Sequence, residues 1–159
     1  MNDVLDEIKI LMQAGMNTTT TKIKSFYQGE VMPVPQSYLP AMMIFGNSTE
    51  IIAKTTAEDQ FVYDITIRVI TDIKKQLKTA GTGEVIKVQQ DLINIMEERN
   101  ANGTLKNDTV LGILRDHIRG TDYMFNNNLT INYNIVAEGE WFYAKAEIRL
   151  EATTDLKAR

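Results

Sequence analysis

The sequence has no cysteine and a single histidine, His117, among its 159 residues. Without cysteine, the chain has no disulfide, no thiolate ligand for zinc or an iron–sulfur cluster, and no cysteine nucleophile. With one histidine, a site of several histidine ligands cannot form within one chain, and a serine–histidine pair has only one candidate base. These two absences exclude many enzyme classes and most transition-metal sites.

Long apolar runs are also missing from the sequence. The apolar run at 41–45 has five residues, whereas a membrane-spanning helix needs about 20. The first residues, 1–6, lack the basic and then apolar pattern of a secretory signal. The sequence therefore predicts a soluble protein that is made in a cytoplasm and has no contact with a membrane.

Charge and size are those of an ordinary globular protein. The formal net charge is −4, charged residues make up 24% of the chain and hydrophobic residues 43%. This length suits one domain with one sizeable core, so we expect a single domain over 1–159 that ends in a polar tail at 152–159. The acidic balance argues against binding nucleic acid through net charge.

Three segments have the apolar spacing of an amphipathic helix, namely 3–14, 84–99 and 108–119. Asn107 or Asp108 is predicted to cap the third helix, because both side chains can accept a hydrogen bond from a backbone N–H in the first turn.

Alternating apolar and polar residues predict the strands, and the clearest pattern lies at 61–73, where side chains such as Phe61 and Val69 fall on one face. Residues 49–55 are predicted either to pair with 41–45 as a hairpin or to continue it as one long bent strand. The other predicted strands are 22–28, 41–45, 129–135 and 142–150, the last two joined by a turn at 138–139.

The order of these elements predicts the fold class. Strands follow one another through turns, and the prolines Pro33, Pro35 and Pro40 make 31–40 an extended loop outside the regular ladder. We therefore expect an α+β fold with two layers, in which helices pack on one face of a mostly antiparallel sheet, in the order α-β-β-β-α-α-β-β. The other face is predicted to be polar and to face solvent, a lumen or a neighbour.

Two features suggest chemistry but have simpler structural explanations. His117 could act as a general base, but packing or the dipole of a helix end explains it more simply. The segment Gly81-Thr82-Gly83, followed by Lys87, lacks the Gly-Lys-Ser/Thr ending of a P-loop and the third glycine of a dinucleotide-binding motif. We therefore expect a plain turn there and no cofactor.

Carboxylates on the strands are candidate ligands for Mg²⁺, the ion that supports much phosphoryl chemistry. Asp64 and Asp72 share a strand face, and Glu147 lies on a strand that could neighbour it. On a straight strand, however, the two aspartates lie roughly 26 Å apart, and Arg68 and Lys145 could pair with the carboxylates as a solvated ladder. We therefore predict no metal site, and keep a small Mg²⁺-dependent DNA-processing enzyme as an alternative.

Four features follow one another along the chain. They are the N-terminal amphipathic helix, the segment Tyr38-Leu39-Pro40-Ala41-Met42-Met43-Ile44-Phe45-Gly46, the long strand 59–71, and the central helix before a closing β-hairpin. In this order they resemble the tail terminator, or tail completion, proteins of long-tailed bacteriophages, in which a Leu-Pro-Ala motif and an apolar strand precede a hairpin and a long strand. The resemblance covers most of the chain.

The resemblance implies a structural role without catalytic residues. Proteins of this family form a hexameric ring on the last ring of the tail tube, stop its polymerisation and present a surface to the neck, or stopper, proteins. In contractile phages the ring can also meet the end of the sheath, and DNA passes through the lumen. We therefore expect a virion protein at the junction of tail and neck, assembled in the host cytoplasm, that is not an enzyme.

The candidate interfaces are loop 28–40, the turn 54–60, the connection 74–83 and the C-terminal tail, since exposed loops reach beyond a domain. The simplest explanation of the lysine cluster in 74–83 is that it forms the solvated end of a strand. The functional alternative is that these lysines contact an acidic partner. A small-ligand binding module, with a pocket between helices and sheet, is the third function kept open. The candidate interface residues are Tyr38, Lys54, Glu58, Lys74, Lys75, Lys78 and Arg159.

Overall fold

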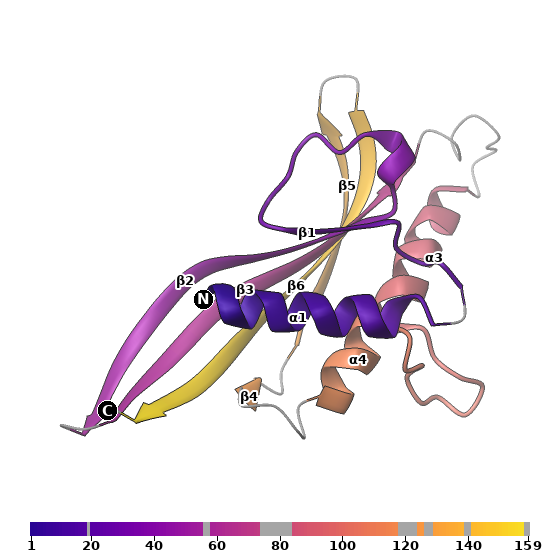
Figure 1. Cartoon of the computed structure of the whole chain (residues 1–159). Coiled ribbons are helices and arrows are strands. Elements are labelled where there is room, and N and C mark those ends of the chain that lie inside the picture. Colours follow the sequence, from indigo (N-terminus) through magenta and orange to yellow (C-terminus); the bar gives the residue numbers. More distant parts are fainter. Residues whose placement is uncertain are drawn as a thin grey trace.

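The computed structural model describes residues 1–18, 20–55, 58–73, 84–117, 124–125, 129–138 and 141–157. In this part of the chain the helices are α1 (Asn2–Met16), α3 (Glu84–Glu97) and α4 (Val110–His117), with one 3₁₀ helix, η1 (Gln36–Tyr38). The strands are β1 (Ser25–Gln28), β2 (Ala41–Thr55), β3 (Glu58–Asp72), β4 (Met124–Phe125), β5 (Ile131–Glu138) and β6 (Trp141–Lys157). Figure 1 shows their arrangement.

The described strands form one sheet in which the three longest, β2, β3 and β6, lie side by side. Its order is β1-β2-β3-β6-β4, and β5 also pairs with β6. Only β1 and β2 pair in parallel, because the proline-rich loop between them (residues 29–40) carries the chain back to the end where β1 starts. The predicted α+β class is confirmed, and the parallel pair and the short β4 depart from the predicted order.

Both β2 and β6 are longer than the sequence predicted. Residues 41–55 form one strand with a register shift at Asn47, so the second of the two alternatives for 49–55 is correct. β6 continues to Lys157, so the prediction of a polar tail at 152–159 is wrong for 152–157. These residues pair with β3 along its first part, and the backbone hydrogen bonds of that ladder outweigh the polarity of the side chains.

The outer ends of β2, β3 and β6 form a three-stranded arm that extends past the helices (Figure 1). We define the arm as residues 48–55, 58–64 and 151–157. Phe61 and Tyr63 stack on it, with ring centroids 6.2 Å apart, and pack partly against the main core. Tyr63 therefore anchors the base of the arm, and Phe61, opposite Ile51, extends this contact further along it.

The main core fills the space between one face of the sheet and the helices. The apolar stripe of each helix points into it, as the helical spacing predicts. On β6, Ala144 and Ala146 are fully buried, and their small side chains leave room for α3, which contacts this strand. The buried helical side chains are Val4, Leu5, Ile8, Met12, Met16, Leu92, Ile95, Met96, Val110, Leu111, Ile113 and Leu114.

A second, smaller core lies on the opposite face of the sheet, beneath the proline-rich loop. Val34 and Leu39 from the loop pack there on Ala41, Met43 and Ile70. The prediction that this face is polar is therefore wrong at the loop end, where Ile70 is only 2% exposed. Because proline fixes an extended backbone, the loop lies along the strands and buries their apolar side chains.

Thr109 caps the start of α4. Its Oγ1 accepts a hydrogen bond from the backbone N–H of Gly112 at 3.1 Å, and the residue is fully buried. The prediction of Asn107 or Asp108 as the cap is wrong, because Asp108 instead pairs with Lys22, with 2.9 Å between Oδ2 and Nζ.

Replacing Thr109→Val should lower the free energy of unfolding by about 1–3 kcal/mol, because valine has the same shape and leaves the buried Gly112 N–H without a partner. Thr109→Ser keeps the hydroxyl and should cost less. Urea unfolding of the wild type and both variants measures the difference. Equal losses for the two variants would contradict the capping role.

Candidate functional site

Most of the large exposed apolar side chains lie at the two ends of the long strands. We call the outer part of the arm, residues 51–55 and 58–61, the arm tip. There Ile51 is 60% exposed, and Ile52, on the other face of the sheet, is also exposed. β3 connects this tip to the proline-rich loop, because it runs for 15 residues, about 46 Å at the usual strand rise. The exposed apolar side chains at the loop end are Val31, Met32, Tyr38 and Phe142.

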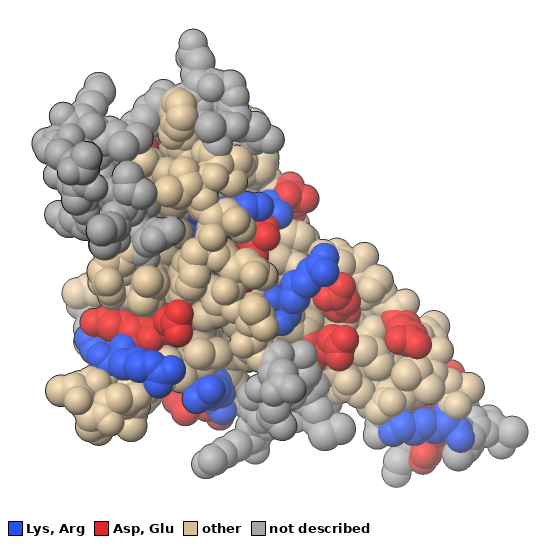
Figure 2. Space-filling model, turned by 180° about the vertical axis from the view of Figure 1, so that it is seen from behind, with Lys and Arg blue, Asp and Glu red and all other residues tan. Residues whose placement is uncertain are grey.

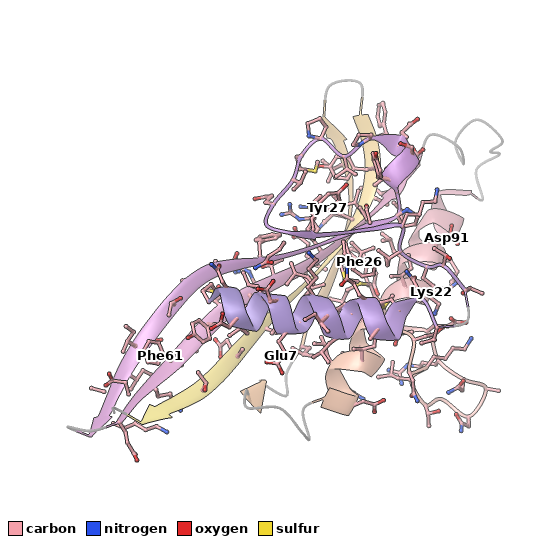
Figure 3. All side chains as sticks on the ribbon, viewed as in Figure 1. Glu7, Lys22, Phe26, Tyr27, Phe61 and Asp91 are labelled. Carbon is pink, nitrogen blue, oxygen red and sulfur yellow. The ribbon has the colours of Figure 1, made fainter. Side chains whose placement is uncertain are left out.

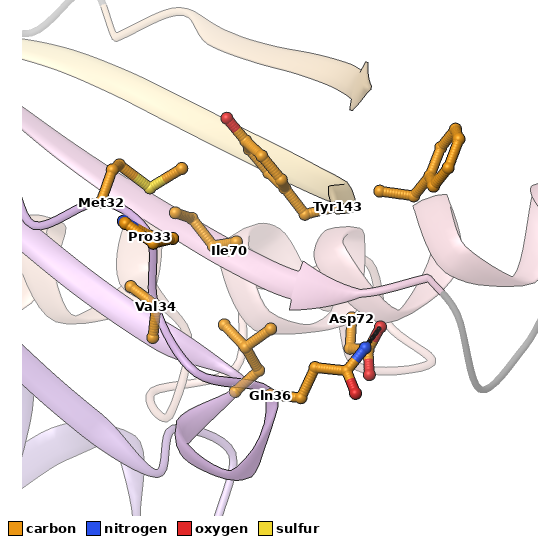
Figure 4. A pocket seen from close by; sticks show the side chains of 9 residues that line it. Met32, Pro33, Val34, Gln36, Ile70, Asp72 and Tyr143 are labelled. Carbon is orange, nitrogen blue, oxygen red and sulfur yellow. Dashed lines mark hydrogen bonds between the residues drawn. The ribbon is translucent and has the colours of Figure 1, made fainter. Parts of the chain in front are cut away.

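At the loop end, a cavity of about 360 Å³ lies between the proline-rich loop and the ends of β3 and β6 (Figure 4). We call it the loop pocket. Its lining is mainly apolar, and Gln36 and Asp72 form a polar edge, where Nε2 of Gln36 donates a hydrogen bond to Oδ1 of Asp72 at 3.5 Å. The apolar and aromatic lining residues are Met32, Pro33, Val34, Ile70, Phe142 and Tyr143.

A second cavity, of about 600 Å³, lies on the other side of η1, beside α3. We call it the α3 pocket. Its rim carries charges of both signs, with Lys22 and Lys24 from the chain before β1 and Asp91 from α3, and Figure 3 shows Lys22 and Asp91 at this end of the molecule. Gln36, Leu39 and Asp72 line both pockets, so η1, the residue after it and the end of β3 form the wall between them.

On the polar face of the sheet, Arg68 is the centre of an ion cluster. Its Nε donates a hydrogen bond to Oε1 of Glu147 at 2.5 Å, and its Nη1 pairs with Glu30 of the proline-rich loop. Lys145 also pairs with Glu147, at 3.3 Å, and the guanidinium lies 5.0 Å from the ring centre of Phe45. The cluster therefore ties the proline-rich loop to the middle of the sheet.

The Arg68 cluster also changes the acidity of Glu147. Burial raises the pKa of this carboxyl, but the hydrogen bond and charge of Arg68, with the charge of Lys145, outweigh the burial and hold the pKa below its ordinary value of 4.5. Glu147 is therefore ionised in the folded protein at neutral pH and serves as a fixed partner for Arg68.

The predicted interface residues fall at both ends of the molecule rather than on one surface. Tyr38 is the last residue of η1 and is 53% exposed, whereas Lys54 and Glu58 are exposed at the arm tip. The other predicted interface residues, Lys74, Lys75, Lys78 and Arg159, lie outside the described residues, as do Gly81-Thr82-Gly83 and the side chain of His117.

The structure does not bring the candidate Mg²⁺ ligands together. Asp64 and Asp72 are eight residues apart on one continuous strand, and Glu147 lies between them, opposite Arg68. Across the described ranges, no group of three acidic or histidine side chains is placed to hold a metal ion.

The α3 pocket was missed by the sequence analysis. Its residues come from the chain before β1, from η1, from the end of β3 and from the middle of α3. Each segment carries an ordinary pattern of its own, so no local signal in the sequence marks this site.

The described acidic and basic side chains are interspersed on the face shown in Figure 2, and neither sign forms a large patch there. This mixture is typical of a surface that neither attracts nor repels a polyanion strongly.

Comparison with protein-family models and with curated protein sequences found no match. Within the described part of the chain, no helix has the length and apolar character needed to cross a membrane.

Lowering the pH should remove the stabilisation that Glu147 gains from Arg68. Because folding holds the pKa of Glu147 below 4.5, this stabilisation is complete above about pH 5.5 and is lost as the pH falls through the lowered pKa of the folded state. Arg68→Met should lower the free energy of unfolding by about 1–3 kcal/mol at pH 7, and by less at pH 3. Urea unfolding at both pH values measures these changes.

Arg149→Met is the matched control, because Arg149 is exposed on the same face of β6. It should leave the pH dependence unchanged. If Arg68→Met had the same dependence on pH as the wild type, the pairing of Arg68 with Glu147 would not contribute to stability as described.

Proposed function

We propose that this chain is a structural protein of a bacteriophage virion, a tail terminator that caps the tail tube. In this role it forms a closed homo-oligomeric ring, a hexamer in the family it resembles, ends polymerisation of the tube and provides the interface to the neck proteins. Genomic DNA passes through the lumen, and in a contractile tail the ring also meets the sheath. The protein acts through complementary surfaces rather than through catalysis.

The observation that best supports this proposal is that two unlike surfaces lie at opposite ends of β3. The arm tip presents exposed side chains, Ile51 on one face of the sheet and Ile52 on the other, and the loop end presents a mainly apolar pocket. A contact between unlike surfaces is heterologous, and it gives a closed ring when the rotation that it repeats adds up to a full turn. Two copies of one surface would instead form a two-fold dimer.

Charge distribution agrees with a lumen through which DNA slides. A channel lined with cations would hold the phosphates of DNA and slow its passage. The net charge of the chain is −4, and the face in Figure 2 mixes both signs.

Charged substitutions at either surface should stop ring formation. Ile51→Glu changes the arm tip and Met32→Glu changes the loop pocket, and each variant keeps one surface intact. When the two variants are mixed in equal amounts, the intact arm tip of one can bind the intact pocket of the other. We therefore expect dimers but no rings in the mixture, measured by sedimentation velocity in the presence of tail-tube subunits.

Ile10→Glu is the matched control for this experiment. Ile10 is 64% exposed on α1, away from both ends of β3, so this variant should form rings like the wild type. Rings formed by either end variant alone, or a mixture that stays monomeric, would show that these are not the two ring surfaces.

Deleting the coding sequence from a phage genome that carries it should leave heads and tails unjoined, with tails of irregular length. Electron microscopy of the lysate measures both features. The wild-type chain supplied from a plasmid should restore joined particles, and Ile51→Glu should not. Tails of normal length that join heads without this protein would be incompatible with the proposed function.

A further inference from the structure

The outer part of β2 is an open edge of the sheet. β1 pairs only with residues 41–44 of β2, and in the described part of the chain no other strand lies beside residues 48–54 on this side. We call residues 48–54 the β2 edge, which forms the upper border of the arm in Figure 1. Such an edge offers unpaired N–H and C=O groups to another strand, and it contains no proline that would block the pairing.

The direction of the backbone decides which residues of the β2 edge can pair. On the inner part of β2, the C=O of Ile44 accepts a hydrogen bond from the N–H of Gly29 at 2.9 Å, so the backbone of Ile44 points outward. This direction alternates along a strand, and the register shift at Asn47 changes the outward set from even-numbered to odd-numbered residues. The outward backbone groups of the β2 edge therefore belong to Thr49, Ile51 and Ala53.

Both faces of the β2 edge carry an exposed apolar side chain. Ile51 is 60% exposed on the helix side, where it lies opposite Phe61, and Ile52 is 39% exposed on the other face. Single exposed apolar residues are common on protein surfaces. Two neighbouring isoleucines on an unpaired strand, however, mark a place where another strand associates.

The β2 edge is complementary to itself. When two copies pair antiparallel about Ile52, this residue lies opposite the partner's Ile52, and Ile51 lies opposite the partner's Ala53. The outward residues 51 and 53 then form hydrogen-bonded pairs. Glu50 lies opposite the partner's Lys54, so that unlike charges oppose each other at both ends of the pairing. Lys54 has an interaction within its own chain, and the pairing requires only its positive charge.

Other antiparallel registers of two β2 edges are less favourable. A register centred on Glu50 or on Lys54 places like charges directly opposite each other, which is destabilising. A register centred on Ile51 places Glu50 opposite an isoleucine. A register shifted by one residue brings outward backbone groups opposite inward ones, so the ladder cannot form.

We propose that two copies of this chain associate through the β2 edge, so that the sheet of one copy continues into the sheet of the other. The contact is isologous, and its two-fold axis passes between the two Ile52 side chains. The paired segment is short and the interface is small, so we expect a dissociation constant of about 10–100 µM.

This dimer forms without tail-tube subunits and does not depend on the proposed function. Its consequence for assembly does rest on that function. Ile51 faces the partner chain in the dimer, so it cannot enter the loop pocket of another copy. The dimer is then the resting form of the free subunit, and the ring on the tail tube replaces it.

Sedimentation velocity of the chain alone, from about 5 to 500 µM, tests the proposal. The wild type should change from monomer to dimer over this range. Glu50→Lys places two lysines opposite each other, and Lys54→Glu places two glutamates opposite each other. Each variant should therefore dimerise about tenfold more weakly than the wild type.

Reversing both charges separates the register from the net charge. The double variant Glu50→Lys, Lys54→Glu exchanges the two signs, so it should dimerise within about threefold of the wild type. An equimolar mixture of the two single variants should form a mixed dimer, because each lysine pair then meets a glutamate pair. Both residues are exposed, so the thermal midpoint of the monomeric variants should match that of the monomeric wild type.

Glu58→Lys is the matched control. It makes the same change of charge at an exposed position of the arm tip, but it lies on β3, which has a strand on each side. This variant should dimerise like the wild type.

Three results would overturn the proposal. The first is a wild type that stays monomeric at about 500 µM, well above the expected dissociation constant. The second is a double variant as weak as the single variants, and the third is a control as weak as Glu50→Lys. A dimer that behaves as expected while no ring forms with tail-tube subunits would contradict the proposed function alone.

Discussion

The antiparallel pairing of β3 with β6 joins fifteen residue pairs, from Glu58 opposite Lys157 to Asp72 opposite Tyr143. This ladder supplies two of the three strands of the arm, and at its other end it brings Tyr143 beside Asp72 at the loop pocket. It also places Ala146 on the helix side, where α3 can pack closely. Both ends of the molecule and the main core therefore depend on the same set of backbone hydrogen bonds.

Side chains alternate along β3, so its two faces contribute to different parts of the structure. Ile67 and Thr71 face the helices, whereas Arg68 and Ile70 face the proline-rich loop. Neighbouring residues on one strand thus contribute to the main core, the α3 pocket, the ion cluster and the loop pocket. The loop pocket and the α3 pocket share Gln36, Leu39 and Asp72, so a change in any of these three residues alters both.

Helices and strands whose apolar residues recur at a regular spacing were predictable from the sequence. The helices and the strand at 61–73 follow the spacing of their apolar side chains, because burial of one face stabilises both kinds of element. The proline-rich loop was predicted to be extended. Its packing over Ile70 was not predicted, because no local signal shows that a single apolar residue within a polar pattern will be buried. The cap at Thr109 was missed because Asp108 pairs with Lys22, far away in the sequence.

By itself, the sequence determined the α+β class, the positions of the main helices and strands, and the absence of cysteine chemistry, because composition and the spacing of apolar residues are properties of the sequence alone. Tertiary structure alone decided that residues 152–157 continue β6, because β3 offers them backbone partners. It also decided that Thr71 and Asp91 line one pocket, and that two unlike surfaces lie at opposite ends of one strand. These features arise from contacts between distant segments, and no local pattern encodes such contacts.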